Sequence, residues 1–125
     1  MNKQKFEDYI HAGNIPGSGK ASSYVRALDL LSEMLKAHPM GFADCQKIWN
    51  VKSVERIESL YRLALAESKK GNQSKWNLTG IPKSYLQNGY CSAALKAYQQ
   101  FLEQYNLWFL FITFWIRKRL IVFSF

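Results

Sequence analysis

The chain has 125 residues and a formal net charge of +8, from 17 lysines and arginines against 9 aspartates and glutamates. This length fits one domain that buries its own core, and the charge favours a polyanionic partner or an anionic membrane surface. The two cysteines, Cys45 and Cys91, lie far apart and lack Cys-x-x-Cys spacing, which excludes a metal or redox motif. Both thiols are therefore expected to be reduced and buried.

The N-terminal segment predicts a short helix from Lys3 to His11, with Phe6, Tyr9 and Ile10 on one side. Lysines stand beside acidic residues in this segment, and it contains no apolar run of the kind that a secretory signal needs. A cytoplasmic location is therefore expected.

The segment from Gly13 to Ser22 resembles a P-loop in composition. Its glycine spacing is one residue too long, and Ala21 stands where a magnesium-binding hydroxyl is required. The segment therefore predicts a glycine-rich turn into a helix, where backbone N–H groups with Lys20 and Ser18 can hold one DNA phosphate.

Three longer segments predict helices from the spacing of their apolar residues. They run from about Ala21 to Ala37, from Ser53 as a candidate N-cap to Gly71, and from Asn88 or Gly89 to Tyr105. The segment between Gly71 and Lys83 is polar and predicts a loop. Since no strand pattern is convincing, the sequence predicts an all-α fold, a bundle of four to five helices.

The composition changes abruptly after Asn106, because 14 of the 19 residues from Leu107 to Phe125 are apolar. The apolar run from Leu107 to Ile116 is too short for a bilayer span, which needs about 20 residues. We therefore divide the chain into a helical DNA-binding-like module (1–106) and an atypical apolar tail (107–125) that includes the basic run 117–119. The tail is open to two interpretations. It can be an anchor at a membrane interface, or it can be a truncated or out-of-frame ending. We favour the second because the amphipathic pattern of the preceding helix stops at Asn106.

Residues for catalysis or metal binding do not group in the sequence. Glu67-Ser68-Lys69 has the Glu-x-Lys spacing of a nuclease half-motif, but it ends an amphipathic helix and predicts a solvated helix end. His11 and His38 are the histidines, and neither has a second metal ligand or a nucleophile beside it. We expect no catalytic residue, no metal and no cofactor in this chain.

An acid-free stretch from Ser68 to Leu102 is the strongest functional signal. Its lysines alternate with aromatic rings and amides, groups that contact phosphates, stack on bases or bond to base edges. The stretch therefore predicts double-stranded DNA as the partner. The candidate contacts within it are Lys69, Lys70, Lys75, Trp76, Lys83, Asn88 and Tyr90.

Two helix motifs resemble a known family. The segment Gly19 to Leu28 resembles the "S-Y-x-x-A-L" helix of a small helical module found ahead of HNH and other restriction-type endonuclease domains, and Asn88 to Tyr98 resembles that module's closing helix. The likeness covers about Phe6 to Tyr105, and the apolar tail stands where that family has its nuclease domain. It implies a DNA-binding accessory module, or a truncated remnant of the endonuclease, without a catalytic site of its own. The DNA contacts that it implies are Lys20, Ser22, Ser23 and Arg26, with Lys83, Asn88 and Tyr90.

Two other interpretations stay open. The helix that starts at Gly19 also resembles the core-binding domain of phage-type tyrosine recombinases, which grips DNA without supplying the nucleophile. The apolar tail instead favours a module that binds a protein partner or associates with a membrane surface.

Overall fold

The computed structural model describes residues 2–15 and 17–123, and the backbone alone for residues 108, 109 and 118–123. Within this part of the chain the regular elements are all helices, which confirms the predicted all-α fold. The α-helices are α1 (Lys3–Ala12), α2 (Lys20–Ala37), α3 (Val54–Lys69), α4 (Ser84–Gln87) and α5 (Tyr90–Phe123). Three short 3₁₀ helices lie between them, η1 (Ala43–Cys45), η2 (Ile48–Asn50) and η3 (Gly71–Gln73).

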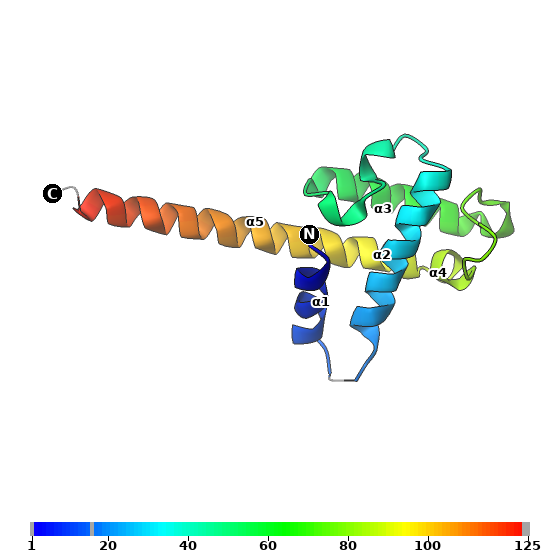
Figure 1. Cartoon of the computed structure of the whole chain (residues 1–125), viewed down its shortest axis with the longest axis horizontal. Helices are drawn as coiled ribbons and strands as arrows, with labels where there is room; N and C mark the ends of the chain where they lie inside the picture. The colour runs from blue at the N-terminus through cyan, green and yellow to red at the C-terminus, as the bar shows by residue number, and fades with distance from the viewer. Residues whose placement is uncertain (1, 16, 124–125) are drawn as a thin grey trace.

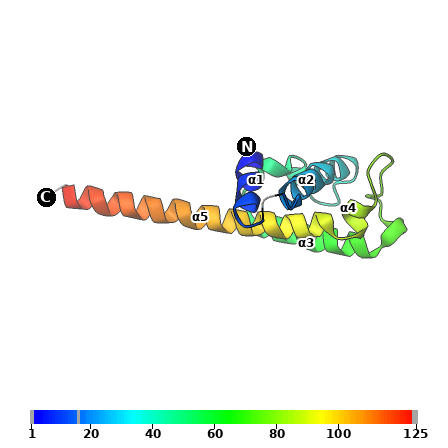
Figure 2. The same cartoon turned by 90° about the horizontal axis from the view of Figure 1, so that it is seen from below.

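The helices form two layers. In Figure 1, α3 and the first part of α5 lie side by side and run in opposite directions. The view in Figure 2 places α1 and α2 over this pair, as a helical hairpin. The hairpin contacts α5 from both of its helices, so the core lies between the two layers.

Local signals account for the helix ends. Ser53 Oγ accepts a hydrogen bond from the backbone N–H of Arg56 at 3.2 Å, which confirms Ser53 as the N-cap of α3. Gly19 precedes α2 with φ +73°, and Gly71 follows α3 with φ +58°. Glycine suits both junctions because it has no Cβ to oppose a left-handed backbone.

An aromatic cluster forms the centre of the core. The ring of Phe6 from α1 lies 5.7 Å from that of Trp49 and 5.5 Å from that of Tyr98 on α5, measured between centroids. The hydroxyl of Tyr98 donates to the carbonyl of Val51 at 2.9 Å, so this buried phenol is satisfied. Rings from three elements therefore join the two layers.

Both cysteines are buried free thiols, as the sequence predicts. Burial raises the pKa of Cys45 to about 11 and that of Cys91 to about 12. Because the thiolate is the reactive form, these residues behave as small apolar core residues.

Helix α5 extends well beyond Tyr105, where the sequence pattern predicts its end. The segment contains no glycine or proline to stop the helix, and a helix needs an amphipathic pattern only where it packs on a core. Leu102 is the last buried core residue among those whose side chains are described, whereas Leu107 and Phe114 are 67% and 68% exposed. Figure 1 shows the continuation leaving the domain as a single helix. Among the described residues no helix combines the length and apolar character that a membrane crossing requires.

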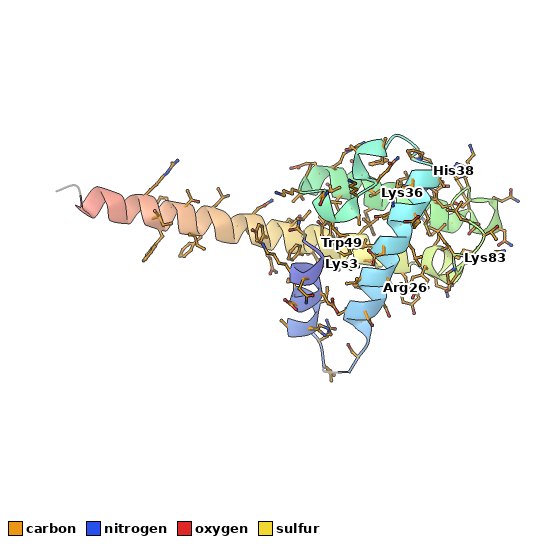
Figure 3. All side chains as sticks on the ribbon, in the orientation of Figure 1. Lys3, Arg26, Lys36, His38, Trp49 and Lys83 are labelled. Carbon is orange, nitrogen blue, oxygen red and sulfur yellow. The ribbon has the colours of Figure 1, made fainter. Side chains whose placement is uncertain are left out.

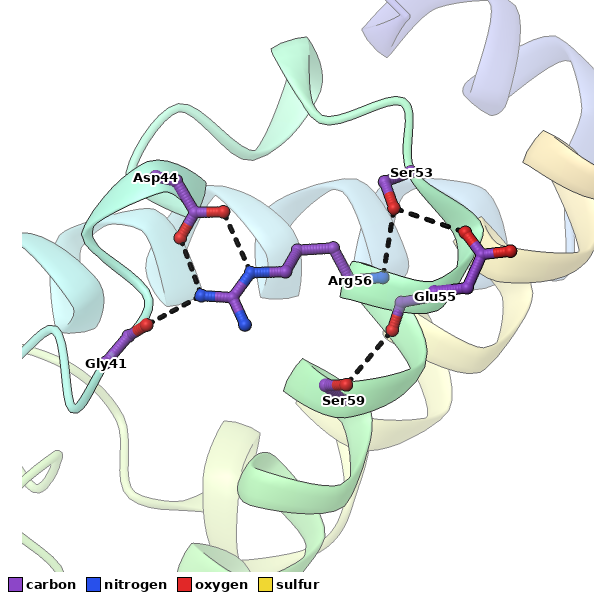
Figure 4. Close-up of polar contacts among 6 residues, drawn as sticks. All are labelled: Gly41, Asp44, Ser53, Glu55, Arg56 and Ser59. Atoms are coloured by element: carbon purple, nitrogen blue, oxygen red, sulfur yellow. Dashed lines mark hydrogen bonds and ion pairs between the residues drawn. The ribbon is translucent and has the colours of Figure 1, made fainter.

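An ion pair ties the η1 region to α3. The guanidinium of Arg56 donates to both carboxylate oxygens of Asp44 at 2.8 Å, and its Nη2 also donates to the carbonyl of Gly41 at 2.6 Å (Figure 4). The hydrogen bonds from Arg56 lower the pKa of Asp44 from its ordinary value of 3.8 to about 2. This pair supports the fold and lies outside the predicted site residues.

Candidate nucleic-acid interface

The first two turns of α2 carry four of the residues predicted to contact DNA. Lys20, Ser22 and Arg26 are exposed, and Ser23 is half-buried. The hydroxyl of Ser22 donates to the carbonyl of Gly19 at 3.0 Å. At about 100° per residue, Ser22, Ser23 and Arg26 lie on one side of the helix, whereas Lys20 lies about 120° around the axis from Arg26. The start of α2 therefore presents Arg26 together with two hydroxyls, and Lys20 lies beside Ser23.

A row of three side chains connects α2 to the junction of α4 and α5. The guanidinium carbon of Arg26 lies 5.7 Å from the centroid of the Tyr85 ring, a distance that permits a cation–π interaction. The Tyr85 ring lies 5.6 Å from the ring of Tyr90, which is 43% exposed. The two motif helices, distant in sequence, therefore meet at this row.

We name the basic face the group made by this row and by the predicted contacts within a few residues of it in the chain. It comprises Lys20, Ser22, Ser23, Arg26, Lys83, Tyr85, Asn88 and Tyr90. Figure 3 labels Arg26 on α2 and Lys83 beside α4. Seven of these eight residues are predicted contacts, and Tyr85 is added by the structure.

The cations of the basic face have no carboxylate within 4.0 Å in the described part of the chain. The next acid along α2, Asp29, is held elsewhere. Its carboxylate accepts from Lys3 Nζ at 2.9 Å and from the indole N–H of Trp49 at 2.8 Å. The positive charge of Lys20, Arg26 and Lys83 is therefore available to an anion.

Three further lysines of the acid-free stretch lie at the end of α3 and in the loop after it. Lys69 and Lys75 are exposed, but Lys70 forms an ion pair with Glu67. Lys83 donates to the side chain of Asn72 in this loop at 3.5 Å, which places the loop beside the basic face. The predicted lysines therefore fall into two neighbouring groups. Lys20 and Lys83 belong to the basic face, and Lys69, Lys70 and Lys75 lie around the end of α3. The charge of Lys70 is neutralised by its ion pair with Glu67.

Trp76 is a correction to the predicted site. We expected this ring to contact DNA, but it is fully buried and its indole N–H donates to the carbonyl of His38 at 2.8 Å. A large ring in a long loop can fill a core position when its polar atom finds a partner, and this loop folds back over the end of α2. Trp76 therefore belongs to the core.

Glu67 is a second correction, because the predicted solvated helix end is in fact buried at this residue. Its side chain is 1% exposed and accepts a hydrogen bond from Ser74 Oγ at 2.9 Å. Ser74 Oγ in turn accepts from the backbone N–H of Trp76 at 3.1 Å. The partner lies in the following loop, so the helix pattern alone does not indicate this burial.

A groove adjoins the basic face where α1 and the start of α2 meet α5. We name it the α5 groove, and its volume is about 720 Å³. Its lining contains two lysines, three amides and two tyrosine rings, with no carboxylate. These polar residues are Lys20, Lys96, Asn14, Gln100, Gln104, Tyr9 and Tyr24. Lys96 and the amides are absent from the predicted contacts, although the helical spacing of Lys96, Gln100 and Gln104 already groups them on one side of a helix.

Metal ligands do not gather in the described residues, where no group of three or more His, Cys, Asp and Glu side chains forms. His11 and His38 are exposed at the ends of α1 and α2. The basic face and the α5 groove present cations, hydroxyls, amides and aromatic rings. These groups suit a ligand that carries both negative charge and aromatic rings.

Comparison with known proteins yields no protein-family model, no curated protein and no solved structure that matches the chain. The two motif segments lie at the N-terminal ends of α2 and α5. A functional interpretation therefore rests on the chemistry of the basic face and on these motifs.

Proposed function

We propose that this chain is an accessory module that contacts double-stranded DNA through the basic face, of the kind found with restriction-type endonucleases. The proposal is carried by the row from Arg26 through Tyr85 to Tyr90. This row joins two separately suspected segments into one exposed surface whose cations have no carboxylate partner in the described residues.

Each kind of group on the basic face has a task in this binding mode. Lys20 and the hydroxyls of Ser22 and Ser23 contact phosphates, together with the backbone N–H groups at the start of α2. Arg26 presents a planar guanidinium above the Tyr85 ring, and Asn88 presents an amide, so both suit base edges in the major groove. The module holds DNA, and cleavage is the task of a separate catalytic domain.

The salt dependence of duplex binding tests this proposal. If Lys20, Arg26 and Lys83 each neutralise one phosphate, log K falls with log salt at a slope of about −2.7. The triple variant K20Q/R26Q/K83Q is expected to bind a short duplex with a slope near zero, because each lost contact removes about one unit of slope. Fluorescence anisotropy of a labelled duplex over a salt series measures both slopes.

A matched control removes three positive charges elsewhere. Lys36 and Arg62 pair with nearby carboxylates, and Lys47 lies just before η2. The control variant K36Q/K47Q/R62Q therefore has the same net charge as the test variant, but its basic face is intact. Equal losses of affinity in the two variants would show that net charge alone drives binding, which contradicts the proposal.

A second candidate function comes from the continuation of α5 beyond Asn106. Leu107, Leu110 and Phe114 are each more than 60% exposed on a helix that has left the domain. Such apolar surface marks sites of protein or membrane association, and the basic run 117–119 would favour anionic lipid. This candidate makes the chain an interaction module or one bound at a membrane surface.

Deletion of residues 107–125 tests the second candidate. The full chain is expected to float with vesicles that contain anionic lipid, and the deleted chain to remain unbound. The deleted chain should keep the unfolding midpoint of the full chain, because Leu102 is the last buried core residue among the described side chains of α5. Equal flotation of the two chains would exclude the membrane-surface form of this candidate.

A further inference from the structure

We infer that the α5 groove receives a single DNA strand, so that the preferred ligand is a duplex with a single-stranded extension. This inference rests on the proposed function, because the duplex itself is held by the basic face. It adds a substrate class and a second contact site to that function.

The size of the groove favours one strand. Its volume of about 720 Å³ lies in the usual range of sites for small ligands, roughly 300–1,000 Å³. A duplex has a major groove that is by itself about 12 Å wide, so it can only lie across the rim of such a groove. A single strand is narrow enough to enter.

The charges of the groove suit a phosphate backbone. Lys20 stands on the α2 side and Lys96 on the α5 side, and no carboxylate lines the space between them. The ammonium groups of both lysines lie 5.5 Å from tyrosine ring centroids, those of Tyr24 and Tyr61, which helps to hold them in place. Lysines from α2 and α5 therefore supply the positive charge that single-strand sites use.

The remaining lining groups favour unpaired bases. Asn14, Gln100 and Gln104 offer amides that can bond to base edges, and Tyr9 and Tyr24 offer half-buried rings. In a duplex the pairing edges are occupied by the opposite strand and the ring faces by stacking. These groups can therefore recognise a base only when it is unpaired.

The groove and the basic face are continuous. Lys20 belongs to both, and Tyr90 of the basic face precedes the groove residue Ala93 by one helical turn on α5. A duplex on the basic face can therefore pass one strand directly into the groove.

Three labelled DNA ligands test the inference: a blunt duplex, the same duplex with a single-stranded thymidine extension, and the thymidine oligomer alone. The extended duplex is expected to bind the full chain about tenfold more tightly than the blunt duplex, because stacking and the further contact with Lys96 add to its affinity. The double variant K96Q/Q104A should bind both duplexes with the affinity that the wild type shows for the blunt one. Thermal unfolding of the variant checks that its fold is retained.

The control variant is K47Q, which loses one exposed lysine just before η2, outside the predicted DNA contacts, and keeps the groove intact. It should retain the tenfold preference for the extended duplex. Blunt-duplex binding without any gain from the extension would overturn the inference and leave the proposed function in place. An equal loss of affinity for both duplexes in K96Q/Q104A would also overturn it, and failure of all three DNA ligands to bind would overturn both proposals.

Discussion

The charge state of the exposed carboxylate of Asp44 is set by one neighbour, Arg56. Two hydrogen bonds from Arg56 favour the ionised form, so the pKa of Asp44 is about 2 in the folded chain, against an ordinary value of 3.8. A carboxyl whose pKa is lower in the folded state stabilises the fold above its unfolded pKa. This stabilisation is lost as the pH falls through the folded pKa.

The substitution Asp44→Asn is therefore expected to lower the thermal unfolding midpoint at neutral pH and to have little effect below pH 2. The difference between the wild type and D44N should shrink as the pH falls from 3.8 to about 2, the interval between the two pKa values. Circular dichroism melts over a pH series measure it. A constant difference across this interval would mean that the ion pair does not control the acid sensitivity.

Arg26 and Trp76 show how far residue type alone can predict a contact. Both types are common where proteins bind nucleic acid, and both were predicted to contact DNA. Arg26 is exposed on the basic face, whereas Trp76 is buried and bonded to His38. The type of a residue limits what it can bind, but its burial decides whether a ligand can reach it.

Among the helices, α3 and the loop after it are held together by a short chain of hydrogen bonds. Ser74 donates to the buried carboxylate of Glu67 and accepts from the backbone of Trp76. A buried carboxylate that loses a hydrogen bond is costly because no water replaces the donor. Ser74 therefore fixes the loop that carries Trp76 into the core.

The substitution Ser74→Ala is expected to reduce the free energy of unfolding by about 1–3 kcal/mol. The matched control is Ser59→Ala, which removes an exposed hydroxyl that bonds to the backbone carbonyl of Glu55 within α3. The control should change the free energy of unfolding by less than about 0.5 kcal/mol. Urea unfolding measures both variants, and equal effects would contradict the role given to Ser74.

Helix α5 shows the difference between forming a helix and burying one. Its backbone continues to Phe123 because no helix-breaking residue intervenes, while Leu102 is the last buried core residue among its described side chains. The apolar period correctly located the packed part of the helix. It could not locate the end of the helix, since helix formation and helix packing have different requirements.

In the whole molecule, the hairpin of α1 and α2 over the α3–α5 pair creates both candidate binding surfaces. Arg26 meets Tyr85 where α2 lies beside the junction of α4 and α5, and the α5 groove is lined by α1, the start of α2 and α5 together. Neither surface is made by a single helix. A change that alters how the hairpin packs on α5 would therefore affect both surfaces together.

The sequence by itself determined the all-α class, the starts of α1, α2, α3 and α5 to within two residues, and most of the core. Apolar spacing, the Ser53 cap and the glycines at helix junctions act over a few residues, so their effects are present in any local segment. The resemblance of two segments to a restriction-associated module also came from the sequence, and it remains a proposal.

Only the tertiary structure decided which charged and aromatic residues share a surface. It joined Arg26 to Tyr85 and Tyr90, paired Lys70 with Glu67, and took Trp76 into the core. It also assembled the α5 groove, with Lys96 and Lys20 in one lining. These outcomes depend on contacts between segments distant in the chain, and a local pattern carries no information about which distant side chain will lie beside it.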